Sequence, residues 1–472
     1  MHVTWIGWLF LSLTPALLAL GPRRVYLLMV FFIPFSATAV VNAGTPEGGS
    51  GIQPYIVLGT VWILLEALAA LRRGAVALPK GQGYPLALLS GFALIGVASL
   101  AMPLIINGAV SIVSPELLSD ESIPLRFTWR HITQGLYLVF AIIITTLIAV
   151  RNANQLCRIQ TLRVATIAAV FVSAWGWVQW LFYLLGVPYP AAVFNNSITK
   201  SALGYDKIIE QLGVTRISSV AVEPSIFAQY LLTVFPFLLL AVVWNQRVLS
   251  RRLDAIALLL VGSALLISTS ASAYIGLALT FALATYASYR CRTLRVRHLA
   301  TIATCAVLVV LAYSVSEPVR MWVSDLLLSK TASYSGAERV SSVIRAWGYF
   351  AQYPLLGVGW GSVTSHDLVV KLLANTGLLG LASFSFLASY VIWRLRLGSG
   401  VVRLSRVDQF WHASLFISTV TLLVIVMLTG FSYVFGHMWF VFGLAIAVSS
   451  SRADLGDSSH EVRRPVGSLT AQ

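Results

Sequence analysis

The sequence predicts an all-α membrane protein, a polytopic bundle of about 12 to 13 transmembrane helices. Of its 472 residues, 58% are hydrophobic and only 10% are charged. A water-soluble globule would need far more charge on its surface. Apolar runs also recur from end to end, and about 20 helical residues suffice to cross a hydrocarbon core of roughly 30 Å.

Thirteen apolar runs are long enough to be considered as spans, and several are short enough to be re-entrant instead. The first run has no basic start and no evident small-residue cleavage site, so we expect a retained helix rather than a signal peptide. The expected spans lie near residues 5–20, 25–41, 55–71, 85–106, 132–150, 164–186, 226–244, 254–269, 272–289, 299–314, 368–393, 410–428 and 434–450.

The distribution of charge predicts the orientation, because Lys and Arg accumulate in cytoplasmic loops. One set of alternate loops holds 22 of the 32 basic and 6 of the 17 acidic residues, a net charge of +16. The other set holds 10 basic and 11 acidic residues, a net charge of −1. The first set is therefore expected in the cytoplasm, with the amino end outside. Topology thus accounts for the basic composition, and we expect no nucleic-acid partner.

The sequence divides into three regions. Residues 1–186 are apolar helices joined by short links, which we expect to form a scaffold. Within them, Trp129, Arg130 and His131 start a span, where Trp and Arg suit an anchor among lipid headgroups. Residues 187–450 contain two longer outer loops, 187–225 and 315–367, and are expected to carry the chemistry. The hydrophilic tail, 451–472, is expected to be disordered in the cytoplasm.

The first of these loops places two charges near the outer membrane interface. Arg216 and Glu223 lie just before Pro224, which suits the first turn of the next helix. Charges at such a position are seldom favoured without a function. Two interpretations stay open: an ion pair that holds the loop, or contact with a substrate.

The second loop ends in an amphipathic helix. Its apolar residues recur at a spacing of three and four, as in a helix with one apolar face. Arg339 borders this face and Arg345 points nearly opposite, because six residues at about 100° each leave the two some 120° apart. We therefore do not expect both to bind one phosphate. The apolar positions are Val340, Val343, Ile344, Trp347, Phe350 and Ala351.

His366 follows a glycine-rich turn and directly precedes a long apolar helix. Gly377 and Gly380 lie one turn apart in that helix and predict a close approach of two helices. A histidine with a pKa near neutrality can accept a proton from an attacking hydroxyl group, with Glu223 as the rival base. An interfacial structural histidine is the alternative.

These basic residues predict a ligand that carries a pyrophosphate. The guanidinium group is always charged and stabilises negative charge on a phosphate leaving group. A pyrophosphate at the interface, a lipid tail in the bilayer and a polar group outside describe a lipid-linked glycan. The sequence has no Walker, dinucleotide or Cys-x-x-Cys motif and no Asp-x-Asp pair in the outer loops, so we expect no cofactor and no metal ion.

The run RAWGYFAQYPLLGVGWGSVTSHDLVVKLLANTGLLGL resembles the signature region of the O-antigen ligase and polymerase superfamily. Members carry an Arg, a Trp, a Pro-x-x-Gly-Val-Gly turn, a His-Asn and a Leu-rich helix with Gly-x-x-Gly. Arg216 with EPSIFAQYL resembles the earlier outer-loop Arg of that family. Asp367 departs from the pattern, because it stands where the family usually has Asn, and a carboxylate there could raise the pKa of His366 or pair with it.

The resemblance implies an all-helical glycosyltransferase of the metal-independent GT-C type in the bacterial inner membrane, active on the periplasmic side. The implied reaction transfers a glycan from undecaprenyl pyrophosphate with inversion at the sugar carbon. It also implies pyrophosphate contacts from Arg216 and Arg339, with Arg345 as the alternative, and His366 as the base or as the group that orients the acceptor.

Three functions stay open. A polymerase would elongate lipid-linked repeat units of an exopolysaccharide, capsule or O-antigen, and we favour it because the Glu-Pro-Ser run resembles polymerase-type relatives. A ligase would move the finished glycan to lipid A core. A transporter of lipid-linked oligosaccharide is the third. Expected partners are the glycan donor, a glycan or lipid-linked acceptor, membrane lipids, and chain-length regulator and export proteins.

Overall fold

The computed structural model describes residues 1–44, 50–74, 78–113, 122–198, 216–293, 334–399, 404–430 and 432–450. This part is mostly helical and contains eight helices long and apolar enough to cross a membrane. The structure therefore confirms a polytopic helical bundle. The eight are α4 (Pro54–Arg73), α5 with α6 (Gly83–Ser99 and Met102–Ile106), α7 (Trp129–Asn152), α8 (Gln155–Leu184), α10 (Pro224–Val243), α12 (Ala271–Arg290), α16 (Leu368–Ser399) and α17 (Arg406–Thr429).

Two further helices of the bundle are shorter, α11 (Arg251–Ile267) and α18 (Gly436–Ser450). α11 and α12 follow each other directly and form a hairpin, whose tip has Thr269 at a positive φ of 46°. Several predictions lie outside the described residues: the span at 299–314, most of the loop 315–367 before α15, and the tail.

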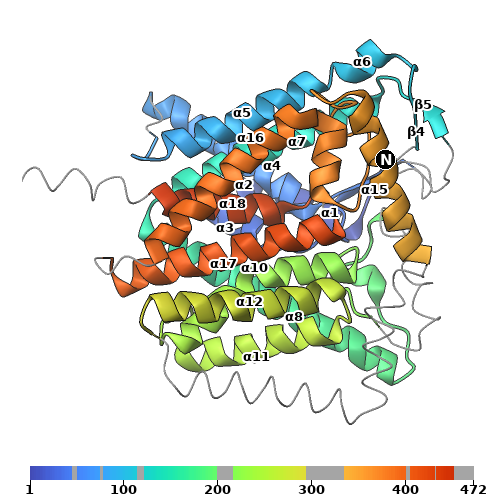
Figure 1. Cartoon of the computed structure of the whole chain (residues 1–472). Helices are drawn as coiled ribbons and strands as arrows, with labels where there is room; N and C mark the ends of the chain where they lie inside the picture. The colour runs from blue at the N-terminus through green and yellow to red at the C-terminus, as the bar shows by residue number, and fades with distance from the viewer. Residues whose placement is uncertain are drawn as a thin grey trace, which may run out of the picture.

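The helices run side by side, and one end of the bundle carries the N terminus, β4, β5 and α15 (Figure 1). We call this the outer end, because the loops predicted to be outer meet there. Helices α10 and α17 form the centre of the bundle. In their most apolar 18-residue stretches, 89% of the residues of α10 and 72% of those of α17 are buried. α17 packs against α10, α12 and α16, and α18 packs against α7. A helix that is apolar all round suits such a central position.

The first two predicted spans are not continuous helices, and this corrects the prediction. Residues 5–20 form α1 (Trp5–Ser12) and α2 (Thr14–Ala19), each too short to cross a membrane alone. In the second run, α3 (Gly21–Phe32) ends early. Pro34 has no backbone N–H and disfavours helical backbone in the residue before it, which explains this end.

Beyond Pro34 the chain is buried and irregular, and neighbouring loops satisfy its backbone. Ala37 donates to Val220 O at 3.0 Å and accepts from Ser197 N at 3.1 Å. Ala39 N donates to Asn196 Oδ1 at 2.7 Å. Non-helical backbone is stable at membrane depth only where protein surrounds it in this way.

Two small sheets and a short helix complete the outer end. Strands β1 (His2–Val3), β2 (Val41–Ala43) and β3 (Ser50–Ile52) form an antiparallel sheet in that order, with Val41 opposite Ile52. β4 (Ser111–Val113) pairs antiparallel with β5 (Ser122–Pro124). The 3-10 helix η1 (Ala191–Val193) precedes the loop that contacts residues 37–39.

The hydrophobic core is divided in two. The large core fills the bundle. A smaller one lies under the outer loops and joins Ile112, Leu125, Ala346, Val363 and Ala374. It fixes α15 (Tyr334–Gln352) and the β4–β5 hairpin to the start of α16 and so gives the outer end a packed structure of its own.

Candidate functional site at the outer end

Helix α16 is broken at Gly377, and the glycine-rich turn fits against the break. Gly377 has φ 64° and ψ −164°, which is not helical. Val358 N donates to Ala374 O at 2.8 Å, and Leu378 N donates to Pro354 O at 2.8 Å. The predicted role of Gly377 in helix–helix contact is therefore wrong: a Cβ at Gly377 would collide with the backbone of Leu355. Glycine here allows the loop to replace the broken helical bonds.

Asn375 and Trp360 hold this turn in place. Asn375 is fully buried; its Oδ1 accepts from Val363 N at 3.1 Å, and its Nδ2 donates to Val363 O at 2.9 Å. The indole N–H of Trp360 donates to Gln134 O at 3.1 Å, and its ring stacks on Tyr433 at 4.1 Å between centroids. The turn between α15 and α16 is thus rigid up to His366.

The half-buried His366 lies directly before the first turn of α16. Asp367 caps that helix, because its Oδ1 accepts from Val370 N at 2.8 Å. The backbone of His366 packs on Gly430, where an added Cβ would lie 2.9 Å from His366 Cα. The predicted position of His366 at a helix start is confirmed, and a close backbone contact fixes it to the end of α17.

A buried amide connects this contact to α10. Gln229 Nε2 donates to Thr429 Oγ1 at 3.2 Å and to Gly430 O at 3.3 Å. Its Oε1 lies 3.1 Å from His437 Nε2. Since the amide nitrogen is the donor in the first two bonds, His437 Nε2 carries the proton in the third. Gln229 of α10 therefore connects that helix both to the start of α18 and to Gly430, on which the backbone of His366 packs.

Hydrogen bonds to α8 hold the loop before α10 against the bundle. Gln179 Oε1 accepts from Ser218 N at 3.1 Å and from Ser219 N at 2.8 Å, and Ser219 Oγ donates to Val172 O. Residues 217–222 are buried, so this part of the predicted outer loop is an element of the protein interior. The half-buried Arg216 and Glu223 lie at the two ends of this buried segment.

Contacts of these two residues place them beside different helices. Glu223 Oε2 accepts from Ser225 Oγ at 2.7 Å in the first turn of α10. Arg216 lies within electrostatic range of Tyr274, in the first turn of α12. Helices α10 and α12 pack together. Arg216 and Glu223 are therefore at the same end of the bundle as His366.

Helix α15 turns its apolar stripe outwards. Val340, Ile344 and Trp347 are 55%, 66% and 53% exposed, which in a membrane protein suits a helix that lies in the interface. The buried positions Ser342 and Ala346 face the protein. Arg339 and Arg345 are both half-buried and flank this buried side about 120° apart. Since α15 packs on α16, both arginines belong to the outer end.

The role of α7 was not predictable from its sequence alone. Trp129 is 74% exposed, as an anchor would be, but Arg130 Nε donates to Gly361 O at 3.1 Å. His131 Nδ1 accepts from Thr128 N at 3.0 Å, so its Nε2–H faces Ser362 Oγ at 3.1 Å. Arg130 and His131 therefore join α7, from the predicted scaffold, to the turn before His366.

Nor did the sequence indicate the position of Lys371. It lies in α16 one turn after His366 and is only 8% exposed. Its ammonium nitrogen is 4.6 Å from the centre of the Tyr433 ring, and Arg130 is within electrostatic range. Burial of an ammonium group costs several kcal/mol, of which a ring contact offsets about 0.5–2 kcal/mol. No spacing rule could have indicated the pair of Arg130 and Lys371, because 241 residues separate its members.

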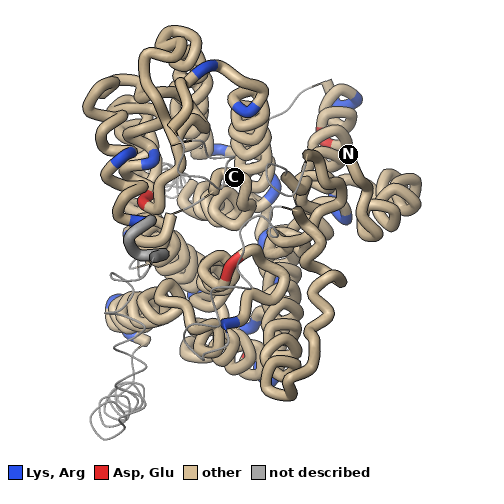
Figure 2. Tube along the Cα trace, turned by 90° about the vertical axis from the view of Figure 1, so that its right-hand side faces the viewer, with Lys and Arg blue, Asp and Glu red and all other residues tan. Residues whose placement is uncertain are grey.

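Charged residues are sparse in the fold, and basic ones predominate (Figure 2). Arg130, Arg216, Arg339, Arg345 and Lys371 all come to the outer end although they come from four separate stretches of the chain. Around them the described acidic side chains of the site are Glu223 and Asp367. These basic side chains could contact a phosphate-bearing ligand, and His366 or Glu223 could accept a proton.

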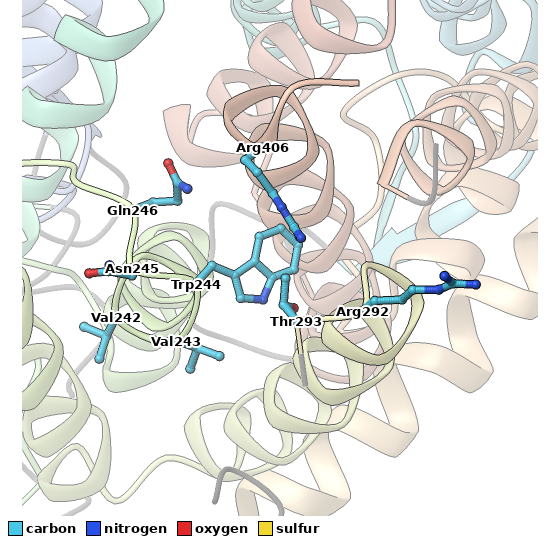
Figure 3. A pocket seen from close by; sticks show the side chains of 8 residues that line it. All are labelled: Val242, Val243, Trp244, Asn245, Gln246, Arg292, Thr293 and Arg406. Carbon is cyan, nitrogen blue, oxygen red and sulfur yellow. The ribbon is translucent and has the colours of Figure 1, made fainter. Parts of the chain in front are cut away.

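A cavity of about 490 Å³ lies at the opposite end of the bundle, where α10 and α12 end and α17 begins. In Figure 3, Arg406 extends toward Trp244 and Thr293, whereas Arg292 extends away from them. Arg406 Nη1 donates to Cys291 O at 3.1 Å, which satisfies a carbonyl near the end of α12. None of the predicted site residues lines this cavity. Its lining residues are Val242, Val243, Trp244, Asn245, Gln246, Arg292, Thr293 and Arg406.

Comparisons with known proteins add no relative. No protein-family model matches the chain, and no curated protein matches it. The fold and its apolar helices define the class on their own: the chain is a multi-pass helical membrane protein. The feature that bears on function is the set of basic residues that lies with His366 at the outer end.

Proposed function

We propose that the protein is a metal-independent, inverting glycosyltransferase that polymerises undecaprenyl-pyrophosphate-linked repeat units on the periplasmic side of the bacterial inner membrane. The observation that carries the proposal is the setting of His366. A titratable side chain begins a helix, its backbone is fixed on Gly430, and basic residues from α7, α15 and the loop before α10 gather at the same end.

The proposed reaction forms one glycosidic bond and breaks one bond to the pyrophosphate. A hydroxyl group of the acceptor attacks the anomeric carbon of the donor sugar and forms the new glycosidic bond. The bond from that carbon to the pyrophosphate oxygen breaks, and the undecaprenyl pyrophosphate leaves with the electron pair. His366, or Glu223 as the rival base, takes the hydroxyl proton. Arg216 and Arg339, with Arg345 as the alternative to Arg339, stabilise the charge on the leaving group.

The outward-facing apolar stripe of α15 suits a lipid-linked substrate. Val340, Ile344 and Trp347 face outward, while the two arginines flank the side that packs on the protein. A helix of this kind can lie at headgroup depth and keep its arginines close to the phosphates of a lipid. The polyprenyl tail would then remain in the bilayer while the glycan extends outside.

One observation favours a second function, transport of a lipid-linked oligosaccharide. Transporters often bind their substrates at broken helices, and α16 is broken at Gly377. The buried Lys371 lies in the half-helix before the break. A transporter moves its substrate without breaking a bond, so the two functions differ in their products.

The test uses purified full-length protein with a synthetic lipid-pyrophosphate repeat unit. We expect longer lipid-linked chains from wild type, without added metal, and none from His366→Ala or Arg216→Ala. Transfer only when lipid A core is supplied would support the ligase. No transfer to either acceptor, together with movement of the lipid across proteoliposomes, would replace the proposal with the transporter.

A further inference from the structure

Two arginines share one tyrosine at the end of the bundle that the sequence predicts to be cytoplasmic. The guanidinium carbons of Arg290, at the end of α12, and of Arg396, near the end of α16, each lie 5.9 Å from the centre of the Tyr286 ring. Arg290 Nη1 also donates to Arg396 O at 3.3 Å, and Arg396 Nε donates to the Tyr286 hydroxyl at 3.2 Å. These contacts hold two positive groups from two helices close to each other.

A third guanidinium group lies next to this pair. Arg406 begins α17, and its Nη1 donates to Cys291 O at 3.1 Å, one residue after Arg290. Arg406 also lines the cavity of about 490 Å³ at this end of the bundle, together with the polar side chains of Asn245 and Thr293. Helix α17 packs against both α12 and α16, so the three arginines come from three helices that pack together. We call Arg290, Arg396 and Arg406 the arginine cluster.

The arginine cluster differs from other arginines at the same end of the bundle. Arg151 Nη1 lies 2.9 Å from Glu66 Oε1, and Arg73 lies 3.8 Å from the same carboxylate. The contacts that the structure describes for the cluster are with carbonyl oxygens and with the hydroxyl and ring of Tyr286. These neutral groups leave the positive charges of the cluster in place, and guanidinium groups pair well with the oxygens of a phosphate.

Exposed aromatic residues indicate the depth of the cluster in the membrane. Tyr289, one residue before Arg290, is 72% exposed, and Trp393, three residues before Arg396, is 55% exposed. Exposed Tyr and Trp rings are typical of the level of the lipid headgroups. The phosphates of phospholipids lie at that level, and basic pockets between helices on the cytoplasmic side commonly bind anionic headgroups. A phosphate held in the bilayer therefore suits the cluster better than a free one.

We propose that the arginine cluster binds the phosphate of an anionic phospholipid from the adjacent leaflet, with the rest of the polar headgroup in the cavity. The lipid connects the ends of α12, α16 and α17, because each of these helices supplies one of the three arginines. The site lies at the end of the bundle opposite His366 and does not depend on the proposed reaction.

The test is native mass spectrometry of the purified full-length protein after incubation with phosphatidylglycerol, or with phosphatidylcholine of the same acyl chains. We expect the wild type to retain phosphatidylglycerol in preference, and an excess of inorganic phosphate not to displace it. The double variant Arg290→Gln with Arg396→Gln should bind phosphatidylglycerol about tenfold more weakly, or less. The control, Arg23→Gln with Arg24→Gln, removes the same charge from exposed positions in α3, also predicted to be cytoplasmic, and should retain the lipid.

Each other outcome would overturn the proposal. Unchanged retention by the double variant, equal retention of the two lipids by the wild type, or an equal loss in the α3 control would show that the cluster is not a specific lipid site. Displacement of the lipid by inorganic phosphate would make the cluster a site for free phosphate instead. If the double variant is not monodisperse, Arg396→Gln alone becomes the decisive variant, because the described contacts of its side chain are with Tyr286.

Discussion

Gly430→Ala should disable the site without changing any residue that contacts substrate. Gly430 has φ 76° and ψ 167°, a conformation that side chains other than glycine rarely adopt. Forcing alanine into it costs about 1–3 kcal/mol. The new Cβ would lie 2.9 Å from His366 Cα, whereas ordinary contacts begin at 3.4 Å. The His366 backbone must therefore move by about 0.5 Å, if a Cβ is to fit against it.

A shift of this size matters for group transfer, since a misplacement of about 1 Å can cost about 10²-fold in rate. We expect Gly430→Ala to lower kcat by about tenfold or more, with pyrophosphate binding at Arg216 retained. The assay is chain elongation at saturating lipid-linked donor, alongside farnesyl pyrophosphate binding.

Gly74→Ala is the matched control. Gly74 also has a positive φ, 73°, and it ends α4 at the other end of the bundle. No atom that the structure describes, apart from its chain neighbours, lies within 4 Å of the position that a Cβ would take there. This variant should lose some stability and keep its rate. Equal elongation rates in the two variants would refute the claim that Gly430 positions His366.

Three further predictions test other parts of the account. Asn375→Ala removes both hydrogen bonds to buried Val363 and should lower the free energy of unfolding by about 1–3 kcal/mol for each group left unpaired. Its thermal midpoint should fall well below that of the control Asn154→Ala, which changes an exposed helix cap. Similar midpoints for the two variants would contradict the role given to Asn375. A spin label at Ile344→Cys on the outward stripe of α15 should be more accessible to membrane-dissolved oxygen than to a water-soluble nickel chelate, and the reverse order would remove α15 from the lipid interface. Burial raises the pKa of the Cys291 thiol, so at pH 7.5 less of it is thiolate than in a free cysteine, and the thiolate fraction grows with pH. Alkylation of Cys291 by N-ethylmaleimide should therefore be slow in the folded protein and faster at pH 9. Equal alkylation rates in folded and unfolded protein would contradict the burial of Cys291.

The sequence was sufficient for the fold class and for the start of several elements. Hydrophobic runs predicted the helices of the bundle, and Pro224 predicted the first turn of α10. His366 was correctly placed before α16, because a polar turn that runs into an apolar stretch indicates a helix start. These features depend on local pattern alone.

Features that depend on tertiary partners were not predictable in the same way. The break of α16 at Gly377 needs the loop at Pro354 to replace its backbone bonds, and a glycine pair cannot distinguish this from helix packing. The spacing of apolar residues in α15 predicted an apolar stripe. Only the packed structure shows that this stripe faces away from the rest of the protein. Arg130 and Lys371 approach each other through folding, so no sequence interval indicates their pairing.

The most direct test of the central claim is the release of undecaprenyl pyrophosphate from lipid-linked repeat units by the purified protein, counted against the glycosidic bonds formed. The account predicts one molecule released for each bond formed in wild type, and neither release nor bond formation in His366→Ala of normal stability. Unchanged activity of His366→Ala, or transport of the intact lipid without release, would contradict the account.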